Sequence, residues 1–284
     1  MSPDNEIRPG QSVELLKTLH ILTADGRLNQ DSRRKLKQVN HLSQFIAPML
    51  EQVRQDGRGV RLVDHGAGKS YLGFILYDEF FKGRDDGSRI WCVETREELV
   101  KKSRELAARL GFSGMEFLHL SAADSIVSDQ LPAKVDVVTA LHACDTATDD
   151  ALRFALKKQA RFVVLAPCCQ AEVAAALRKN KGGDFARGGL TELWRQGLHT
   201  REFGAHATNV LRCLLLEAHG YQVSVTEMVG WEHSLKNELI LAMHKALPGQ
   251  RAAARLAELL QALGLEGLRE RFSVADAPTS PACR

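Results

Sequence analysis

Two glycines that follow a short apolar run and an acidic residue form the most informative motif of the chain. Residues 60–72 read Val-Arg-Leu-Val-Asp-His-Gly-Ala-Gly-Lys-Ser-Tyr-Leu, which predicts a strand, a tight turn and the start of a helix. Gly66 and Gly68 can adopt backbone angles closed to other residues, and they leave room for a ligand against the main chain. The helix start offers free N–H groups to an anion, and Asp64 can accept from an ammonium group. Donors and an acceptor in one turn suit a zwitterion, such as the methionine part of S-adenosylmethionine.

Other nucleotide-binding loops fit this turn less well. A P-loop requires a glycine five positions before the Gly68-Lys69 pair, and Val63 stands there. A dinucleotide fingerprint requires a third glycine, where the chain has Tyr71. An ordinary strand–helix turn without a ligand stays open as an alternative, because isolated Gly-x-Gly matches are common.

Two further acids follow predicted strands. Glu94 ends the second strand, and its two carboxylate oxygens suit the vicinal hydroxyls of a ribose. Asp124 follows the third strand and can accept from the amino group of an adenine. The alternatives are a surface glutamate that caps the next helix and an ordinary loop aspartate.

The ends of the fourth and fifth strands carry histidine, cysteine and aspartate. Residues 141–149 read Leu-His-Ala-Cys-Asp-Thr-Ala-Thr-Asp, in which His142 can act as a general base near neutral pH, with Asp145 as a second candidate. Residues 164–170 read Val-Leu-Ala-Pro-Cys-Cys-Gln, so neighbouring strands should bring three cysteines and His142 together. A metal site, a nucleophilic cysteine and simple packing beneath a ligand all remain open. We favour packing and expect no metal.

Strands and helices alternate from residue 60 onward. The predicted strands are 60–64, 89–94, 116–120, 135–141 and 161–166, and the predicted helices are 70–82, 96–110, 148–158 and 170–178. This alternation is typical of a parallel sheet with helices on both faces, whose ligands bind beyond the carboxyl ends of the strands. A helix at about 206–219, an antiparallel strand pair at about 221–229 and 237–244, and a helix at 249–271 follow.

We expect residues 1–59 to form a helical extension, 60–247 the main domain with an insertion at about 179–205, and 248–284 a C-terminal helix and disordered tail. Basic residues occur in the extension and in the insertion. Candidate contacts for a nucleic-acid or other acceptor are Lys35, Arg187, Trp194 and Arg201, because arginines interleaved with an aromatic suit phosphates and bases. A solvated helical face and a lid are the alternatives.

Composition sets broad limits. The chain has 284 residues, a net charge of +3 and ordinary charged and apolar fractions, so it permits an anionic partner without requiring one. It has no apolar run of the ~20 residues that a membrane span needs, and its first residues do not read as a signal peptide. We expect a cytoplasmic protein with reduced cysteines and no membrane association.

At these motifs the chain resembles a family of class I methyltransferases. The runs at 63–72, 142–149 and 167–169, with the segment 232–237, are similar to the methyltransferase domain 32 type, which includes the Trm13-like tRNA 2′-O-methyltransferases of eukaryotes. The chain departs from that family at Asp145, where glycine is usual, and at Ser70, and its N-terminal region lacks the family's zinc-binding modules.

The resemblance implies an α/β, Rossmann-like fold with a seven-stranded, mostly parallel sheet in the order 3-2-1-4-5-7-6, preceded by the helical extension. It implies S-adenosylmethionine as cofactor, with Asp64, Gly66 and Gly68 at its methionine part. We expect Lys69, Glu94, Asp124 and His142 to complete the cofactor contacts. The expected acceptor is a hydroxyl of RNA, tRNA in particular. The alternatives are a small molecule, a protein side chain, or a cofactor-binding module without catalysis.

Overall fold

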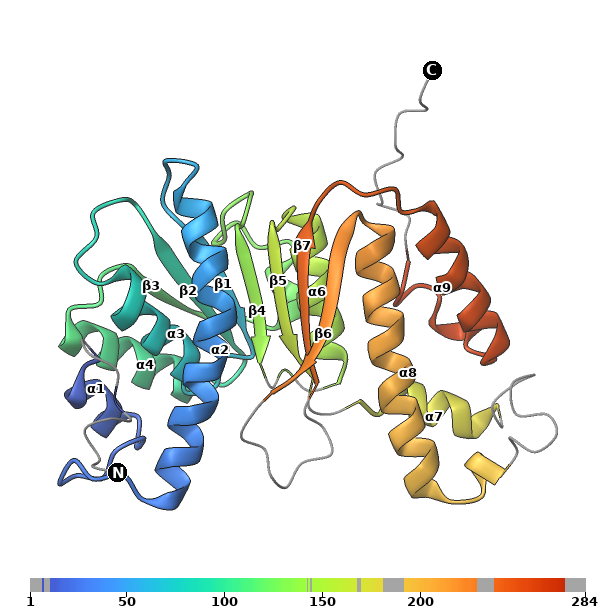
Figure 1. Ribbon diagram of the computed structural model, residues 1–284, viewed down its shortest axis with the longest axis horizontal. Helices are drawn as coiled ribbons and strands as arrows, with labels where there is room; N and C mark the ends of the chain where they lie inside the picture. The colour runs from blue at the N-terminus through green and yellow to red at the C-terminus, as the bar shows by residue number, and fades with distance from the viewer. Residues whose placement is uncertain are drawn as a thin grey trace.

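The computed structural model describes residues 7, 11–141, 143, 145–167, 170–180, 192–228 and 238–273, without the side chains of residues 31, 32, 34, 35 and 38. Figure 1 shows a central sheet with helices on both sides and the C-terminal helix α9 at one end of the molecule.

The sheet has seven strands in the order β3-β2-β1-β4-β5-β7-β6. The strands are β1 Arg61–His65, β2 Arg89–Glu94, β3 Met115–His119, β4 Val137–Leu141, β5 Phe162–Ala166, β6 Tyr221–Glu227 and β7 Glu238–His244. The first five pair in parallel, whereas β7 is antiparallel to both β5 and β6. The strand order and the fold class predicted from the resemblance are confirmed.

Alternating side chains of the strands build a separate core on each face, because successive residues of a strand point to opposite sides. Leu62 packs with helices on one face, while its neighbour Val63 packs on the other. The first face is covered by α1 Val13–Thr18, α2 Gln30–Arg54, α3 Tyr71–Leu76 and α4 Glu97–Leu110. The second is covered by α6 Thr146–Lys157, α7 Glu172–Lys179, α8 Gly197–Ala218 and α9 Gln250–Ala262. Near-continuous apolar strands fit this burial on both sides.

The order of strands creates a switch point between β1 and β4. The chain leaves β1 into α3 on the first face, and it leaves β4 into α6 on the second face (Figure 1). The two connections diverge there, which opens a crevice at the carboxyl ends of the strands. The turn with Gly66 and Gly68 lies at this point, next to the short helix α5 Ala122–Ser125 and the ends of β2 and β3.

The largest correction concerns the start of α8. The helix begins at Gly197 rather than at about residue 206, so its first turns occupy part of the range predicted as an insertion. Gly204 explains why the pattern was hidden. A Cβ on Gly204 would lie 2.6 Å from the Cα of Ala174 in α7, so the glycine permits a close contact between two helices. Glycine in that role reads in sequence as a break in helical periodicity.

Two other helical ranges are shorter than predicted. The region 1–59, expected to be a helical extension, contains α1 and α2 with a loop between them, and α2 begins at Gln30. The last helix ends at Ala262 rather than at 271, and Gly264 follows with a positive φ of 65°. A short 3-10 turn, Glu266–Leu268, then packs back on the same face.

None of the helices in the described part of the chain combines the length and the apolar character needed to cross a bilayer.

Candidate active site

The turn after β1 has the backbone that the sequence predicted. Gly66 and Gly68 have φ values of 64° and 58°, in the region that glycine adopts without strain. A Cβ on Gly66 would lie 3.2 Å from the Cα of Ala143, so this glycine lets the turn pack closely against the end of β4. Lys69 is exposed beside the turn. The turn therefore presents main chain, with little side-chain cover, toward the crevice at the switch point.

Asp64 is a buried carboxylate at the tip of β1. Its Oδ1 accepts a hydrogen bond of 2.6 Å from the hydroxyl of Thr139 on β4, and the residue is 3% exposed. Burial raises the pKa of Asp64 to about 7, and the bond from Thr139 opposes that rise. Among the described residues no cation forms an ion pair with it. A desolvated carboxylate of this kind gains most from a positively charged ligand group.

His65 is the second buried titratable residue of this strand, and no role for it was predicted from the sequence. The ring packs edge-on against Phe154 of α6, and neither ring nitrogen has a hydrogen-bond partner among the described residues. Burial lowers the pKa of His65 to about 3, so the imidazole is neutral near neutral pH.

Glu94, at the end of β2, is held by the turn and by Arg96. One carboxylate oxygen accepts 2.7 Å from the backbone N–H of Gly68, and the other accepts 2.8 Å from Nε of Arg96. Burial alone would raise the pKa of Glu94, but the bonds from Arg96 and the N–H groups hold it below its usual value. The Arg96 side chain is 61% exposed, so it can leave the carboxylate at little packing cost. A ribose would need that rearrangement to reach both oxygens.

Asp124 lies in the first turn of α5, where it bonds to the N-cap residue Ser121. Its Oδ2 accepts 2.6 Å from the hydroxyl of Ser121, which in turn accepts from the N–H of Asp124, so the pair caps α5. The side chain of Asp124 is exposed, and α5 follows β3 directly. The contact of Asp124 with an adenine stays a prediction.

Asp145 follows β4 with φ 50° and ψ −119°, which explains why glycine suits this position. Its Oδ1 accepts from the N–H groups of Ala171 and Glu172, at 2.9 and 3.3 Å, and so satisfies donors at the start of α7. This capping contact accounts for the aspartate, and it stabilises the ionised carboxylate through Oδ1. The other predicted base, His142, lies outside the described residues, as do Cys144, Cys168 and Cys169.

Of the four residues predicted to contact an acceptor, the structure describes the side chains of Trp194 and Arg201. Trp194 is half-buried against the second core, and its ring lies 5.3 Å from the ring of Phe203. Arg201 pairs with Glu202 at 3.2 Å. Lys35 lies on α2, far along the chain from α8, and its side chain is outside the described part; Arg187 lies outside it altogether.

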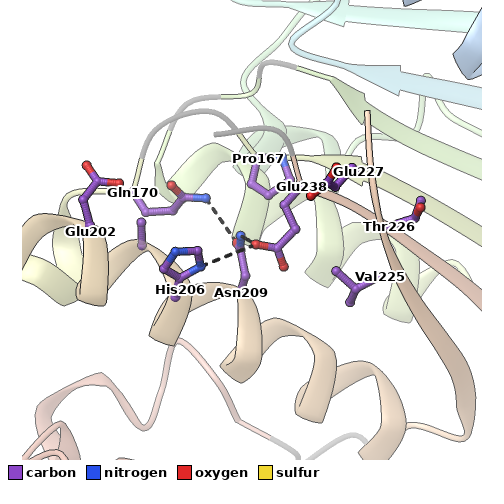
Figure 2. Close-up of a pocket in the computed structure, with 10 residues that line it drawn as sticks. Pro167, Gln170, Glu202, His206, Asn209, Val225, Thr226, Glu227 and Glu238 are labelled. Atoms are coloured by element: carbon purple, nitrogen blue, oxygen red, sulfur yellow. Dashed lines mark hydrogen bonds and ion pairs between the residues drawn. The ribbon is translucent and has the colours of Figure 1, made fainter. Parts of the chain in front are cut away.

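A polar network that the sequence did not reveal lies beyond β5 (Figure 2). Arg212 of α8 is fully buried and forms two bonds, 2.6 and 3.0 Å, with the carboxylate of Asp149 in α6. Arg212 also donates to Oδ1 of Asn209, whose amide donates 2.8 Å to Glu238 at the start of β7. Gln170 donates 3.1 Å to the same Asn209 oxygen. Of these residues, Gln170, Asn209 and Glu238 line a cavity of about 290 Å³.

One signal in the sequence could have indicated this network. Glu202, Ala205, His206 and Asn209 all line the cavity and recur at helical spacing on α8. Because the helix was predicted to start at about residue 206, Glu202 and Ala205 were not recognised as part of that face.

Comparison with known proteins gives one family match. Residues 34–176, half of the chain, match the Methyltransf_32 family, described as a methyltransferase domain. The matched range contains most of α2, the first five strands and the turn after β1.

Curated relatives are more distant. A glutathione S-transferase C-terminal domain-containing protein of Bos taurus is 23% identical over 244 residues, which cover 77% of this chain and 35% of the relative. The Xenopus laevis protein of the same description is 24% identical over 147 residues, covering 51% of this chain and 21% of the relative. The chain therefore spans about a fifth to a third of the length of these relatives.

Among solved structures, magnesium protoporphyrin IX methyltransferase from Synechocystis PCC 6803 with bound SAH has 14% sequence identity and a TM-score of 0.44. The match covers 82% of this chain and 93% of that one. A likeness at this level carries no argument about ligands or activity. The family match and the observed strand order are the stronger findings, and by them this chain belongs to the Methyltransf_32 family of methyltransferase domains.

Proposed function

We propose that the protein is a methyltransferase that uses S-adenosylmethionine. The observation that carries the proposal is Asp64, a buried carboxylate without a cation, at the tip of β1 beside a glycine turn. The ammonium group of the cofactor's methionine part supplies the missing charge. The membership of a methyltransferase-domain family supports the same conclusion.

The cofactor fits the residues of the crevice in the following way. Gly66 and Gly68 leave the main chain open to the methionine part, and the exposed Lys69 stands near its carboxylate. Glu94 accepts from the ribose hydroxyls once Arg96 has moved, and Asp124 accepts from the adenine amino group. When bound, the cofactor supplies an electrophilic methyl group on a sulfonium centre and leaves as S-adenosylhomocysteine.

The remaining chemistry asks the chain for alignment and for one proton acceptor. An attacking atom held in line with the methyl carbon and the sulfur needs little further activation. We assign proton removal to His142, which follows β4 in sequence, rather than to Asp145, whose carboxylate accepts from two backbone N–H groups. The capping role of Asp145 is compatible with a wholly structural contribution.

The acceptor is a separate proposal. A hydroxyl of RNA follows from the resemblance, yet Trp194 is packed and Arg201 is paired with Glu202, which weakens the expected RNA surface. The cavity near Glu238 favours the alternative of a small molecule or a protein side chain. Salt separates the two, because binding of RNA weakens steeply as salt rises and binding of a small neutral or singly charged acceptor does not.

Calorimetric titration with S-adenosylmethionine and S-adenosylhomocysteine tests the cofactor proposal. We expect saturable binding to the wild-type protein and a loss of at least ~30-fold in Asp64→Asn, because the ammonium loses a buried charge-assisted partner. Asp129→Asn, at an exposed loop position, is the matched control and should bind like wild type. Equal affinity of wild type and Asp64→Asn would contradict the assignment of Asp64, and absence of binding by the folded wild type would contradict the proposed function.

A further inference from the structure

The cavity beyond β5 is built from elements that are far apart in sequence. Pro167 and Gln170 follow β5, one face of α8 forms the floor, and the paired ends of β6 and β7 form the opposite wall (Figure 2). The cavity measures about 290 Å³, the size that suits a single side chain or a small amine. Two strand spacings separate β1 from β5 and four separate it from β6, so the cavity lies about 10–20 Å from Asp64 along the same edge of the sheet.

The charge of the described lining residues is negative. Glu227 and Glu238 stand directly opposite each other on the antiparallel strands β6 and β7, an arrangement that is unfavourable for like charges unless a cation compensates. Glu202 adds a third carboxylate from α8, and no lysine or arginine is among the described lining residues. The nearest cationic candidate is His206, whose Nδ1 lies 4.0 Å from the Glu238 carboxylate and whose side chain is 72% exposed.

Hydrogen bonding in the cavity points the same way. One N–H of the Gln170 amide donates to Asn209, and one N–H of the Asn209 amide donates to Glu238, so each amide uses a donor inside the network. The carbonyl oxygen of Gln170 is buried, 3% of the residue is exposed, and this oxygen has no partner among the described residues. The described lining therefore adds an unpartnered acceptor to its carboxylates, and a ligand that donates hydrogen bonds suits it.

Apolar surface lies beside these polar groups. Pro167 and Ala205 border the cavity, and Val225 of β6 is 52% exposed at its side. An alkyl stem would cover these groups and leave its polar end against the carboxylates, as the side chains of lysine and arginine do.

We infer that this cavity binds the methyl acceptor of the protein through an alkylammonium or guanidinium group at the end of an apolar stem. The role of this ligand as methyl acceptor rests on the proposed function, whereas binding of its cationic group does not require the cofactor. The cationic group is the one that is recognised, and the methylated atom lies toward β4, between this cavity and the turn after β1. A phosphate is disfavoured here, because the described lining carries carboxylates and no basic side chain other than His206.

Titration with small probes tests the inference. We would follow the side-chain amide signals of the labelled full-length protein by NMR as n-butylamine, agmatine, n-butanol and butyrate are added. Both cationic probes should bind saturably and shift amide signals that the Gln170→Glu and Asn209→Asp variants lack, whereas butanol and butyrate should bind at least ~10-fold more weakly.

Charge-neutralising variants supply the controls. Glu238→Gln keeps an oxygen that accepts from Asn209, and Glu227→Gln changes an exposed position. Both variants should therefore fold. Each should weaken agmatine binding about tenfold, and Glu258→Gln on the exposed face of α9 should leave it unchanged. Equal binding of butyrate and butylamine, or cation binding that survives both cavity variants, would overturn the inference. S-adenosylhomocysteine titrated into the same samples keeps the outcomes apart: cofactor binding without amine binding refutes this inference alone.

Discussion

At the scale of single residues, β1 ends in two buried titratable groups whose pKa values are displaced in opposite directions. Burial favours the neutral form of each, so it raises the pKa of Asp64 to about 7 and lowers the pKa of His65 to about 3. A fold that needed only stability would gain by replacing either residue with an apolar one. The aspartate at this position was predictable from the glycine turn, whereas the unpaired histidine was not, because a sequence does not show which polar groups lack partners.

The first prediction concerns Asp64→Asn. The folded-state pKa of Asp64 lies above its unfolded value of 3.8, so the folded state loses stability as pH rises from 3.8 through about 7. Asparagine removes that loss and still accepts from Thr139. Relative to wild type, the variant should gain about 2–3 kcal/mol more at pH 8 than at pH 5. Chemical denaturation at both pH values measures the free energies of unfolding, with Asp129→Asn as control. A difference between variant and wild type that is the same at both pH values would contradict the prediction.

The second prediction concerns His65→Leu, where the sign is reversed. The folded-state pKa is below the unfolded value of 6.5, so the unfolded chain binds the extra proton between about 3 and 6.5, and stability rises with pH across that window. Leucine should remove this dependence, so that lowering the pH from 7 to 4.5 costs the variant about 2 kcal/mol less than wild type. Urea denaturation of both proteins at the two pH values checks the result. The exposed His199→Leu should behave like wild type.

At the scale of elements, alternating patterns predicted the first five strands, because buried parallel strands are short apolar runs between turn signals. The same patterns gave the wrong start for α8, a helix that packs closely against a second helix. Gly204 lets α7 and α8 approach closely, so the sequence shows a glycine inside what is a continuous helix. The predicted start at about residue 206 left Glu202 and Ala205 outside the helix, so the sequence did not show that they share a face of α8 with His206 and Asn209 at the cavity.

The third prediction tests the junction between β4 and α7. Asp145 caps α7, but its backbone angles favour glycine. Asp145→Ala should lose the cap and keep the strain, at a cost of about 1–2 kcal/mol, and Asp145→Gly should cost about 1 kcal/mol less. Equilibrium denaturation of the pair gives the comparison. If alanine proved as stable as glycine, the backbone at this position would not be strained as described.

At the scale of the whole molecule, the sheet carries two sites along one edge. The turn after β1 lies at the switch point, and the cavity lies beyond β5, where β7 and β6 extend the sheet in antiparallel fashion. The resemblance predicted the strand order, and the proposed cofactor site follows from it. It could not predict the second, which depends on a buried ion pair between α6 and α8 that brings residues distant in sequence together.

The fourth prediction concerns that ion pair. Arg212→Met leaves the Asp149 carboxylate buried without its partner and should destabilise the protein by about 3–5 kcal/mol. The double variant Arg212→Met/Asp149→Leu should recover most of the loss, because no charge is then stranded. Glu192→Leu/Arg195→Met, at an exposed pair, should change stability by less than ~1 kcal/mol. A double variant no better than Arg212→Met would contradict this account.

The most direct test of the central claim is the number of protons released when S-adenosylhomocysteine binds at pH 6. Its ammonium group is charged at that pH, whereas Asp64, with a pKa of about 7, is mostly protonated in the free protein. Titration calorimetry in buffers of different ionisation enthalpy gives the proton count. Binding of the ammonium to Asp64 predicts release of about one proton per ligand. Tight binding with no proton release would show that the ammonium lies elsewhere, and the assignment of the site would be wrong.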